Sequence, residues 1–467
     1  MKVLLAWPAV TQKEAGFDGN ILPLGLGYLA ANIPGKHEVG LWDGVLTHSS
    51  DNRPLLEEIK RFQPEIIGIS VWIFNLSSAR EMVGLIRERF PKMLIVAGGP
   101  CVSSFGTAIL SWFDVNYAVA GDGERSFPLL LDLCEQAQAT ESNLSKIAGL
   151  IYRNAGGQAI LNPPQWQSLD EVRYPDYDFI RLNEYLAAGF SNGPHQVSRK
   201  APVMSTRGCP FDCAFCSAGL VSGRKVRLRR VESVLTEIRE LYDKYGIRGF
   251  NIIDDNFTMN IAFAKTVCRG LLNMGLKGVS FACSNGIRME FLDEELLCLM
   301  KQAGWVFVTI APESGSERTL QNMGKNLNLE VVKAKVKLIR QAGLKAWGFF
   351  IIGFPGETLE DIRKTVRFMC RTGFDIVSIL CFQPLPGTRS YEKLVMTGEI
   401  GELQGSSNVL DLSYAPVGMS TRQLRRYYLW AYFRFYTSSL QRIRNLISLY
   451  PFSRLLRYIM HLVVPGT

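Results

Sequence analysis

The sequence lacks an apolar run of the kind that crosses a membrane. Charge-free apolar stretches such as 347–355 and 445–453 are far shorter than the ~20 residues that a membrane-spanning helix needs. The apolar run at residues 3–7 follows a single lysine, is too short for a signal peptide and is typical of a buried strand. These absences favour a cytoplasmic protein.

Histidine is scarce, and acidic residues are absent from the C-terminal end. The four histidines, at positions 37, 48, 195 and 461, have no spacing that suits a metal site. The net charge is +9, and nearly all of it comes from eight arginines after residue 411, where no Asp or Glu occurs. Because the rest of the chain is close to neutral, we expect no nucleic-acid partner.

The remaining composition is that of a globular protein. With 467 residues, 47% hydrophobic and 20% charged, the chain is expected to form two or three domains. Strand-length apolar runs alternate with helix-period segments, which indicates parallel α/β architecture. The first series, at 3–7, 39–42, 66–71, 93–97 and 117–120, predicts a Rossmann-like doubly wound sheet over residues 1–140. Residues 141–200 carry turn signals and are interpreted as a linker with a hairpin.

A second series of six strands predicts a partial, TIM-like β/α barrel over residues 201–395. Its strands are expected at 203–206, 249–253, 279–283, 306–310, 346–351 and 376–381. Asp293 and Thr358 are placed to cap intervening helices, and Gly304 is placed to end one. Active-site groups should lie where the strands end. Residues 396–467 are expected to form a helical tail rich in arginine and aromatic residues.

Ten cysteines in a reducing compartment point to metal or redox chemistry rather than to disulfides. Seven are scattered singly, whereas Cys209, Cys213 and Cys216 follow the first barrel strand with the spacing Cys-x3-Cys-x2-Cys. Three close thiolates suit a four-iron, four-sulfur (4Fe-4S) cluster, and the missing fourth ligand leaves one iron open to a substrate or cofactor. Structural zinc is the alternative, although it would need a fourth Cys or His.

This motif, with the aromatic Phe215 before its last cysteine, resembles the hallmark of the radical S-adenosylmethionine (SAM) superfamily. The resemblance implies that the open iron binds SAM and that loops after later strands hold the rest of the molecule. The superfamily's Gly-Gly-Glu element is replaced here by Asp254, Asp255 and Asn256. Taken singly, each of these loops is also compatible with solvated acids or an ordinary turn. The residues that the resemblance assigns to SAM are Phe215, Asp254, Asp255, Arg288, Glu313, Ser314 and Gly353.

The first domain resembles the cobalamin-binding domain that precedes many radical SAM enzymes. Small residues at its strand ends would let the backbone approach a corrin and its nucleotide tail. Val45 stands where the family's cobalt-ligating histidine would fall, which implies cobalamin without that ligand. A doubly wound domain with incidental glycines is the alternative, and no Gly-x-Gly-x-x-Gly follows the first strand to indicate a nicotinamide site. The residues assigned to cobalamin are Ser70, Gly98, Gly99, Pro100, Gly121 and Glu124.

Together, the resemblances imply an enzyme that cleaves SAM reductively at a 4Fe-4S cluster and methylates an unactivated carbon through methylcobalamin. The expected partners are a small-molecule or lipid-like substrate and an electron donor such as flavodoxin or ferredoxin. Oxidation or cyclisation of a tetrapyrrole-like or lipid substrate is one alternative. A non-enzymatic iron-sulfur and cobalamin redox sensor is another. The sequence identifies no catalytic residue beyond these cofactor ligands.

The tail from residue 420 interleaves aromatic residues with arginines. This composition suits peripheral contact with the inner face of an anionic membrane. On a helical wheel, however, the arginines at 422, 425, 426 and 434 spread around the helix instead of gathering on one face. A helix packed over the barrel, closing a pocket for an apolar substrate, explains the aromatic residues equally well.

Overall fold

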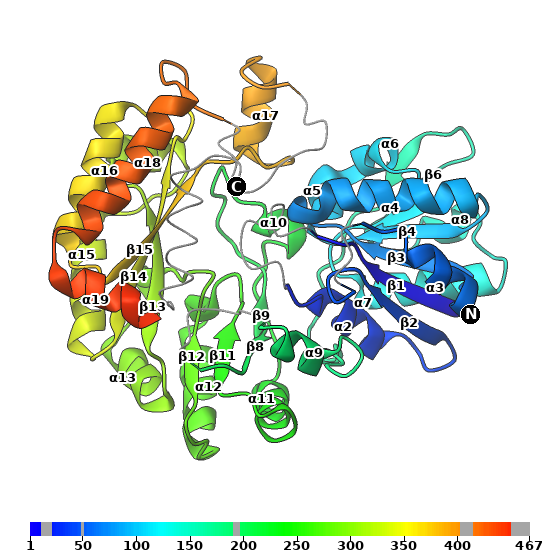
Figure 1. Cartoon of the computed structure of the whole chain (residues 1–467), viewed down its shortest axis with the longest axis horizontal. Helices are drawn as coiled ribbons and strands as arrows, with labels where there is room; N and C mark the ends of the chain where they lie inside the picture. Colours follow the sequence, from blue (N-terminus) through cyan, green and yellow to red (C-terminus); the bar gives the residue numbers. More distant parts are fainter. Residues whose placement is uncertain (11–20, 48–50, 190–196, 402–413, 450–467) are drawn as a thin grey trace.

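The computed structural model describes residues 1–10, 21–47, 51–189, 197–401 and 414–449. An N-terminal sheet with helices on both faces lies beside a curved second sheet with its own helices (Figure 1). The two parts share one continuous apolar core, to which Tyr177, Ile180 and Tyr185 of the connecting segment contribute.

The first five strands form a parallel sheet in the order β2-β1-β3-β4-β5, which confirms the expected doubly wound fold. Buried apolar runs explain why these segments are strands, since a parallel sheet is covered on both faces. The strands are β1 (Lys2–Trp7), β2 (Glu38–Asp43), β3 (Ile66–Ser70), β4 (Leu94–Gly98) and β5 (Tyr117–Val119). The helices are α2 (Leu24–Asn32), α3 (Leu55–Phe62), α4 (Leu76–Arg89), α5 (Pro100–Phe105), α6 (Ile109–Trp112), α7 (Gly123–Glu135) and α8 (Glu141–Leu144).

The hairpin expected within a linker instead extends the first sheet. Strand β6 (Leu150–Arg153) pairs antiparallel with β5, and β7 (Ala159–Leu161) pairs antiparallel with β6. Leu150 and Ile151 are fully buried on opposite faces of the sheet, in two different core clusters. The turn signal identifies a hairpin, but the sheet edge that it joins depends on long-range pairing. The short helix α9 (Leu182–Ala187) follows.

The second part is the expected partial barrel of six parallel strands. Two three-stranded sheets, β12-β11-β8 and β13-β14-β15, are joined by bridges between Phe281 and Trp305 and between Ile287 and Ile310. The side chains of Asp293 and Thr358 accept hydrogen bonds as N-caps, as expected. The strands are β8 (Lys200–Val203), β11 (Gly249–Ile252), β12 (Ser280–Ala282), β13 (Phe307–Glu313), β14 (Lys345–Ile352) and β15 (Ile376–Cys381). The helices are α11 (Val231–Tyr245), α12 (Ile261–Asn273), α13 (Glu294–Ala303), α14 (Glu317–Asn322), α15 (Leu329–Gln341) and α16 (Leu359–Thr372).

Three helices follow the last strand: α17 (Arg389–Met396), α18 (Thr421–Tyr436) and α19 (Leu440–Leu449). Helix α18 runs along α16 and packs on β15, burying Leu424, Ala431 and Phe435 (Figure 1). The packed-helix interpretation of the aromatic tail therefore applies to α18. Among the residues placed in the structure, no helix is both long and apolar enough to cross a membrane.

Candidate active site

The three clustered cysteines lie in the loop between β9 (Thr206–Arg207) and α10 (Ala218–Val221). Main-chain bonds hold this loop, with Cys209 N–H donating to the Gly223 carbonyl at 3.0 Å and Ala214 N–H to the Met323 carbonyl at 2.8 Å. Gly208 begins the loop at φ +98°, where a Cβ atom would lie 2.2 Å from the Lys225 carbonyl oxygen. Only glycine fits at this position.

Burial disfavours the ionised form of two thiols of this loop in the absence of a bound metal. Burial raises the pKa of Cys209. Cys216 keeps exposed surface, yet the protein atoms around its thiol raise its pKa to about 11, and the neighbouring Cys213 and Cys209 add to the shift. Thiols with raised pKa values ionise when a bound metal charge offsets the desolvation. The donor set therefore fits an iron-sulfur cluster.

Asp254 and Asp255 hold the cysteine loop in place. The buried Asp254 carboxylate accepts hydrogen bonds from Ser205 N–H at 2.6 Å and from the Thr206 hydroxyl at 2.9 Å. Burial raises the pKa of Asp254 to about 6, although these bonds oppose the shift. Asp255 accepts from Gly208 N–H at 2.8 Å. Both residues were assigned to SAM, but the structure gives their carboxylates partners in the strand and loop that carry the cysteines.

Arg288 lies against the same loop. Its guanidinium is 3.6 Å from the centre of the Phe211 ring, between Cys209 and Cys213, and pairs with Glu290 at 2.9 Å. Its side chain is largely buried, so the ring contact fixes the plane of the guanidinium. The structure therefore places Arg288 against the loop that carries the cysteines.

Glu313 lies at the carboxyl end of β13 in a strained conformation. Its φ of +68° is in the left-handed region, and the strand register shifts between Ile310 and Glu313. Such strain is found mainly at functional sites, where the surrounding structure enforces it. Lys325 holds the buried Glu313 carboxylate at 2.9 Å. Sequence reasoning missed Lys325, since nothing local marks it as the partner. Ser314 instead bonds the Thr365 hydroxyl of α16 at 3.0 Å.

Gly353 and Phe354 form a turn closed by a buried carboxylate. Glu357 accepts hydrogen bonds from Gly353 N–H at 2.5 Å and Phe354 N–H at 3.3 Å, and burial raises its pKa to about 8. The Phe354 ring meets the Phe215 ring edge-on, with centres 6.4 Å apart. The turn therefore lies beside the residue that precedes the last cysteine of the loop, and Leu424 of α18 packs on Gly353.

The residues assigned to cobalamin at β3 and β4 meet at one sheet edge. Ser70 and Gly98 are adjacent partners at the strand ends. Gly99 at φ +105° approaches Val71 so closely that a Cβ atom would lie 2.7 Å from its carbonyl oxygen, and Pro100 starts α5. A Cβ atom at Gly98 would meet nothing within 4 Å. This open, Cβ-free edge fits the approach of a corrin or its nucleotide tail.

The family's histidine position is part of the protein core. Val45 is 6% exposed, and the Asp43 carboxylate accepts hydrogen bonds from Val45 N–H at 3.0 Å and from the Tyr185 hydroxyl at 2.8 Å. Asp43 therefore stabilises its own turn and anchors the connecting segment. His48 lies outside the described residues.

Gly121 and Glu124 have hydrogen-bond partners from other segments of the protein. Gly121 N–H donates to the Ser103 hydroxyl at 2.8 Å, and the Glu124 carboxylate pairs with Arg207 at 2.6 Å. The sequence does not reveal these partners, because they come from distant segments.

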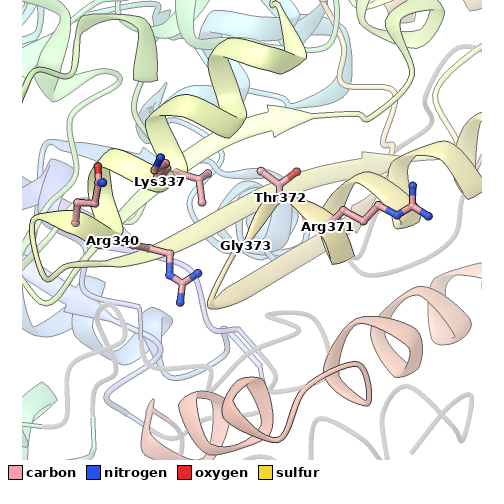
Figure 2. A pocket seen from close by; sticks show the side chains of 7 residues that line it. Lys337, Arg340, Arg371, Thr372 and Gly373 are labelled. Atoms are coloured by element: carbon pink, nitrogen blue, oxygen red, sulfur yellow. The ribbon is translucent and has the colours of Figure 1, made fainter.

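A basic cavity of about 500 Å³ lies where α15 and α16 end, which is the end of the barrel opposite the carboxyl ends of its strands (Figure 2). Lys337, Arg340 and Arg371 line it, and Arg340 also approaches Asp375 at 3.8 Å. Cations are favourable at helix C-termini, which accounts for this cluster. The cavity is therefore separate from the candidate active site.

Comparison with known proteins gives matches over both parts. Residues 203–369 match the radical SAM superfamily, and residues 15–131 match the B12 binding domain. An uncharacterised methyltransferase of Pyrococcus horikoshii is 31% identical over 450 residues, which cover 93% of each chain. Cytidylyl-2-hydroxyethylphosphonate methyltransferase of Streptomyces wedmorensis is 27% identical, covering 85% of this chain and 82% of its own. The solved structure of the radical SAM methyltransferase TsrM of Kitasatospora setae has a TM-score of 0.72 at 21% identity, covering 91% of this chain and 85% of that one.

The fold and the three-cysteine loop define a radical SAM protein with a B12 domain ahead of its barrel. The chain belongs to the cobalamin-dependent radical SAM enzymes. The predicted family, fold class and cofactors (4Fe-4S cluster, SAM and cobalamin) are confirmed, and the redox-sensor alternative has no support. The individual ligand assignments stay predictions.

Proposed function

We propose that the protein is a C-methyltransferase that methylates an unactivated carbon of a small molecule or lipid-like substrate. The observation that carries this proposal is the proximity of the two predicted cofactor sites. Helix α10, which starts two residues after Cys216, packs against α5, which starts directly after Gly99 (Figure 1). Relatives named as methyltransferases support the same activity.

The cofactors supply the hard chemistry, namely one electron for reductive cleavage of SAM and a methyl group carried on cobalt. Cys209, Cys213 and Cys216 would hold the cluster, with Asp254 and Asp255 fixing the position of their loop.

Two elements of the barrel would orient SAM beside the cysteines. Arg288, fixed against the loop, offers a cation for the SAM carboxylate, and the paired Glu313 and Lys325 sit at the next strand end. The Gly353–Phe354 turn, held by Glu357, offers an apolar wall beside Phe215 that would exclude water.

The test is anaerobic reconstitution with iron, sulfide, cobalamin and methyl-labelled SAM, followed by mass spectrometry of products from a cell extract. Replacing any one of Cys209, Cys213 or Cys216 by Ala should abolish cluster content and SAM cleavage. Cys283→Ala is the matched control, because that thiol is buried elsewhere in the core. Equal iron loss in the control and the loop variants would overturn the ligand assignment.

A second candidate function is oxidative cyclisation. An anaerobic magnesium-protoporphyrin IX monomethyl ester cyclase of Rubrivivax gelatinosus is 24% identical over 400 residues, 84% of this chain and 70% of its own. The two functions differ in their products. Methylation should give S-adenosylhomocysteine together with 5'-deoxyadenosine, whereas 5'-deoxyadenosine with no transferred label would favour cyclisation.

We further propose that flavodoxin or ferredoxin delivers the electron at the side of Cys216, the most exposed residue of the three cysteines. SAM cleavage driven by either reduced protein, at a rate comparable with dithionite, is the expected result. Cleavage that dithionite supports and neither protein supports would contradict it.

We also propose peripheral contact of α18 and α19 with an anionic membrane at the inner face. Phe433 and Leu440 are 68% and 75% exposed, and the adjacent Arg434 adds positive charge. Each arginine near anionic lipid is worth ~1 kcal/mol. Phe433→Ser with Leu440→Ser should reduce co-sedimentation with anionic vesicles, whereas Met396→Ser, an 86% exposed residue on α17, should not. Absence of wild-type protein from the vesicle pellet would overturn this proposal.

A further inference from the structure

Four largely buried charged side chains join the two domains next to the start of the cysteine loop. Arg207 contacts Asp122 at 2.8 Å through one guanidinium nitrogen and Glu124 at 2.6 Å through another. Arg227 binds the second oxygen of Asp122. The side chains of these four residues, here named the interdomain quartet, are between 4% and 20% exposed. The acids belong to the first domain and the arginines to the second.

The quartet is neutral only when the domains are docked. Arg207 and Arg227 are direct cross-strand partners on β9 and β10 (Arg227–Leu228), an arrangement in which like charges repel. Asp122 and Glu124, from the start of α7, supply the two compensating charges. Removing one partner of a buried ion pair leaves an uncompensated charge, which is strongly unfavourable. The two domains are therefore coupled through a contact that tolerates little displacement.

Aromatic rings fix the orientation of both guanidinium groups. The Arg207 guanidinium lies 4.8 Å from the centre of the Tyr28 ring, and that of Arg227 lies 5.3 Å from the centre of the Trp166 ring. A planar guanidinium group that is hydrogen-bonded through two nitrogens and lies over a ring has one favoured orientation. An ammonium group is not oriented in this way. The contact therefore sets direction as well as distance.

The arginines and the acids of the quartet each adjoin a segment that is predicted to bind a cofactor. Arg207 precedes Gly208, whose N–H is held by Asp255, and Cys209 follows at once. Asp122 is the residue before α7 and follows shortly after the end of β5, at the same sheet edge as the glycines that follow β4. A change in the docking of the domains would thus move the cysteine loop relative to that edge.

We propose that the interdomain quartet sets the distance and orientation between the cluster and cobalamin. Its members are positioning residues, because they act through the cysteine loop and through the strand ends of the first domain. This inference rests on the proposed function for the nature of the two cofactors. In this proposal Glu124 positions the two domains relative to each other and does not bind cobalamin directly.

The test compares full-length holoenzymes by pulsed electron paramagnetic resonance, which measures the distance between the reduced cluster and cob(II)alamin. Glu124→Gln should broaden the distance distribution while iron and cobalamin contents stay at wild-type levels. Glu135→Gln is the matched control, because this carboxylate lies at the other end of α7 and pairs with the N-terminal amine of its own domain at 2.7 Å. Its distribution should match the wild type. An unchanged distribution in Glu124→Gln would overturn the proposal.

The arginine is tested by graded replacement. Arg207→Gln should broaden the distribution as Glu124→Gln does. Arg207→Lys keeps the positive charge but loses the planar guanidinium group, so its distance distribution should be narrower than that of Arg207→Gln and broader than that of the wild type. A general packing defect would instead make the lysine and glutamine variants equally broad, and that result would also overturn the proposal.

Amide hydrogen exchange of the cofactor-free protein gives a second readout. Glu124→Gln should raise exchange in the first turn of α7 and in β9 and β10, and leave β1 unchanged. Exchange that rises throughout the first domain, or nowhere, would refute the coupling. If the wild-type protein bound no cobalamin, the proposed function would fail while this measurement still decided whether the quartet couples the domains.

Discussion

Strand β15 is the outermost strand at one side of the partial barrel. Two tyrosines of α18 form hydrogen bonds with its main chain. The Tyr432 hydroxyl accepts from Ile379 N–H at 2.9 Å and donates to the Ile379 carbonyl at 3.2 Å. Tyr436 makes the same pair of contacts with Val377, at 3.5 and 3.2 Å. Four residues of helix span ~6 Å and two residues of strand ~6.7 Å. The two rings are stacked with their centres 6.3 Å apart, a spacing close to that of four residues along α18 and of two residues along β15.

Replacing Tyr432 by Phe removes the hydroxyl and keeps the ring. Each bond contributes ~0.5–1.5 kcal/mol net, and a buried polar group left unpaired costs ~1–3 kcal/mol. Because Ile379 is fully buried, we expect Tyr432→Phe to lower the free energy of local opening at β15 by about 1–3 kcal/mol. Tyr436→Phe should cost less, since its contact with Val377 N–H is longer.

Hydrogen exchange at the Ile379 amide measures this effect directly. A loss of 1.4 kcal/mol corresponds to a tenfold rise in exchange, so Tyr432→Phe should accelerate the Ile379 amide by roughly tenfold or more. Tyr427→Phe is the control on the same helix, because its hydroxyl accepts an exposed hydrogen bond from Arg363, away from β15. If the Ile379 amide exchanged equally slowly in Tyr432→Phe and wild type, the Tyr432 hydroxyl would not stabilise the main chain of β15.

Three further predictions concern the site itself. Burial raises the pKa of Glu357 to about 8, so the folded state holds this proton more tightly than the unfolded state. The free energy of unfolding should therefore fall as pH rises from about 4.3 towards 8, and chemical denaturation of Glu357→Gln should lack that slope. Lys325→Met leaves the Glu313 carboxylate buried without its partner and should cost about 3–5 kcal/mol in the same assay, whereas adding Glu313→Gln should recover part of the loss. A double variant less stable than the single one would contradict the pairing. Electron paramagnetic resonance of the cob(II)alamin form should show no nitrogen splitting from a protein histidine, because Val45 occupies the family's ligand position; such splitting would contradict the assignment.

Local patterns were sufficient to predict much of the fold. The alternation of strand and helix signals predicted both parallel sheets, and Asp293 and Thr358 cap the helices that their positions indicated. The three cysteines were recognisable because their spacing spans eight residues of one loop. These features depend on residues that are close in the chain, so the sequence displays them directly.

The tertiary structure decided which partner each buried polar group takes. Asp254 follows the end of β11 and Glu124 lies in the first turn of α7, and the sequence predicted cofactor contacts for both. In the structure their carboxylates bind Ser205 and Arg207. Lys325 reaches Glu313 across a separate turn, and Tyr432 reaches an edge strand 53 residues away in the chain. A buried charge must find a counter-charge, but the chain order does not say which one lies within reach. The sequence by itself therefore determined the class of cofactor chemistry, whereas only the packing of the two domains determined how the cofactor-binding loops are held relative to each other.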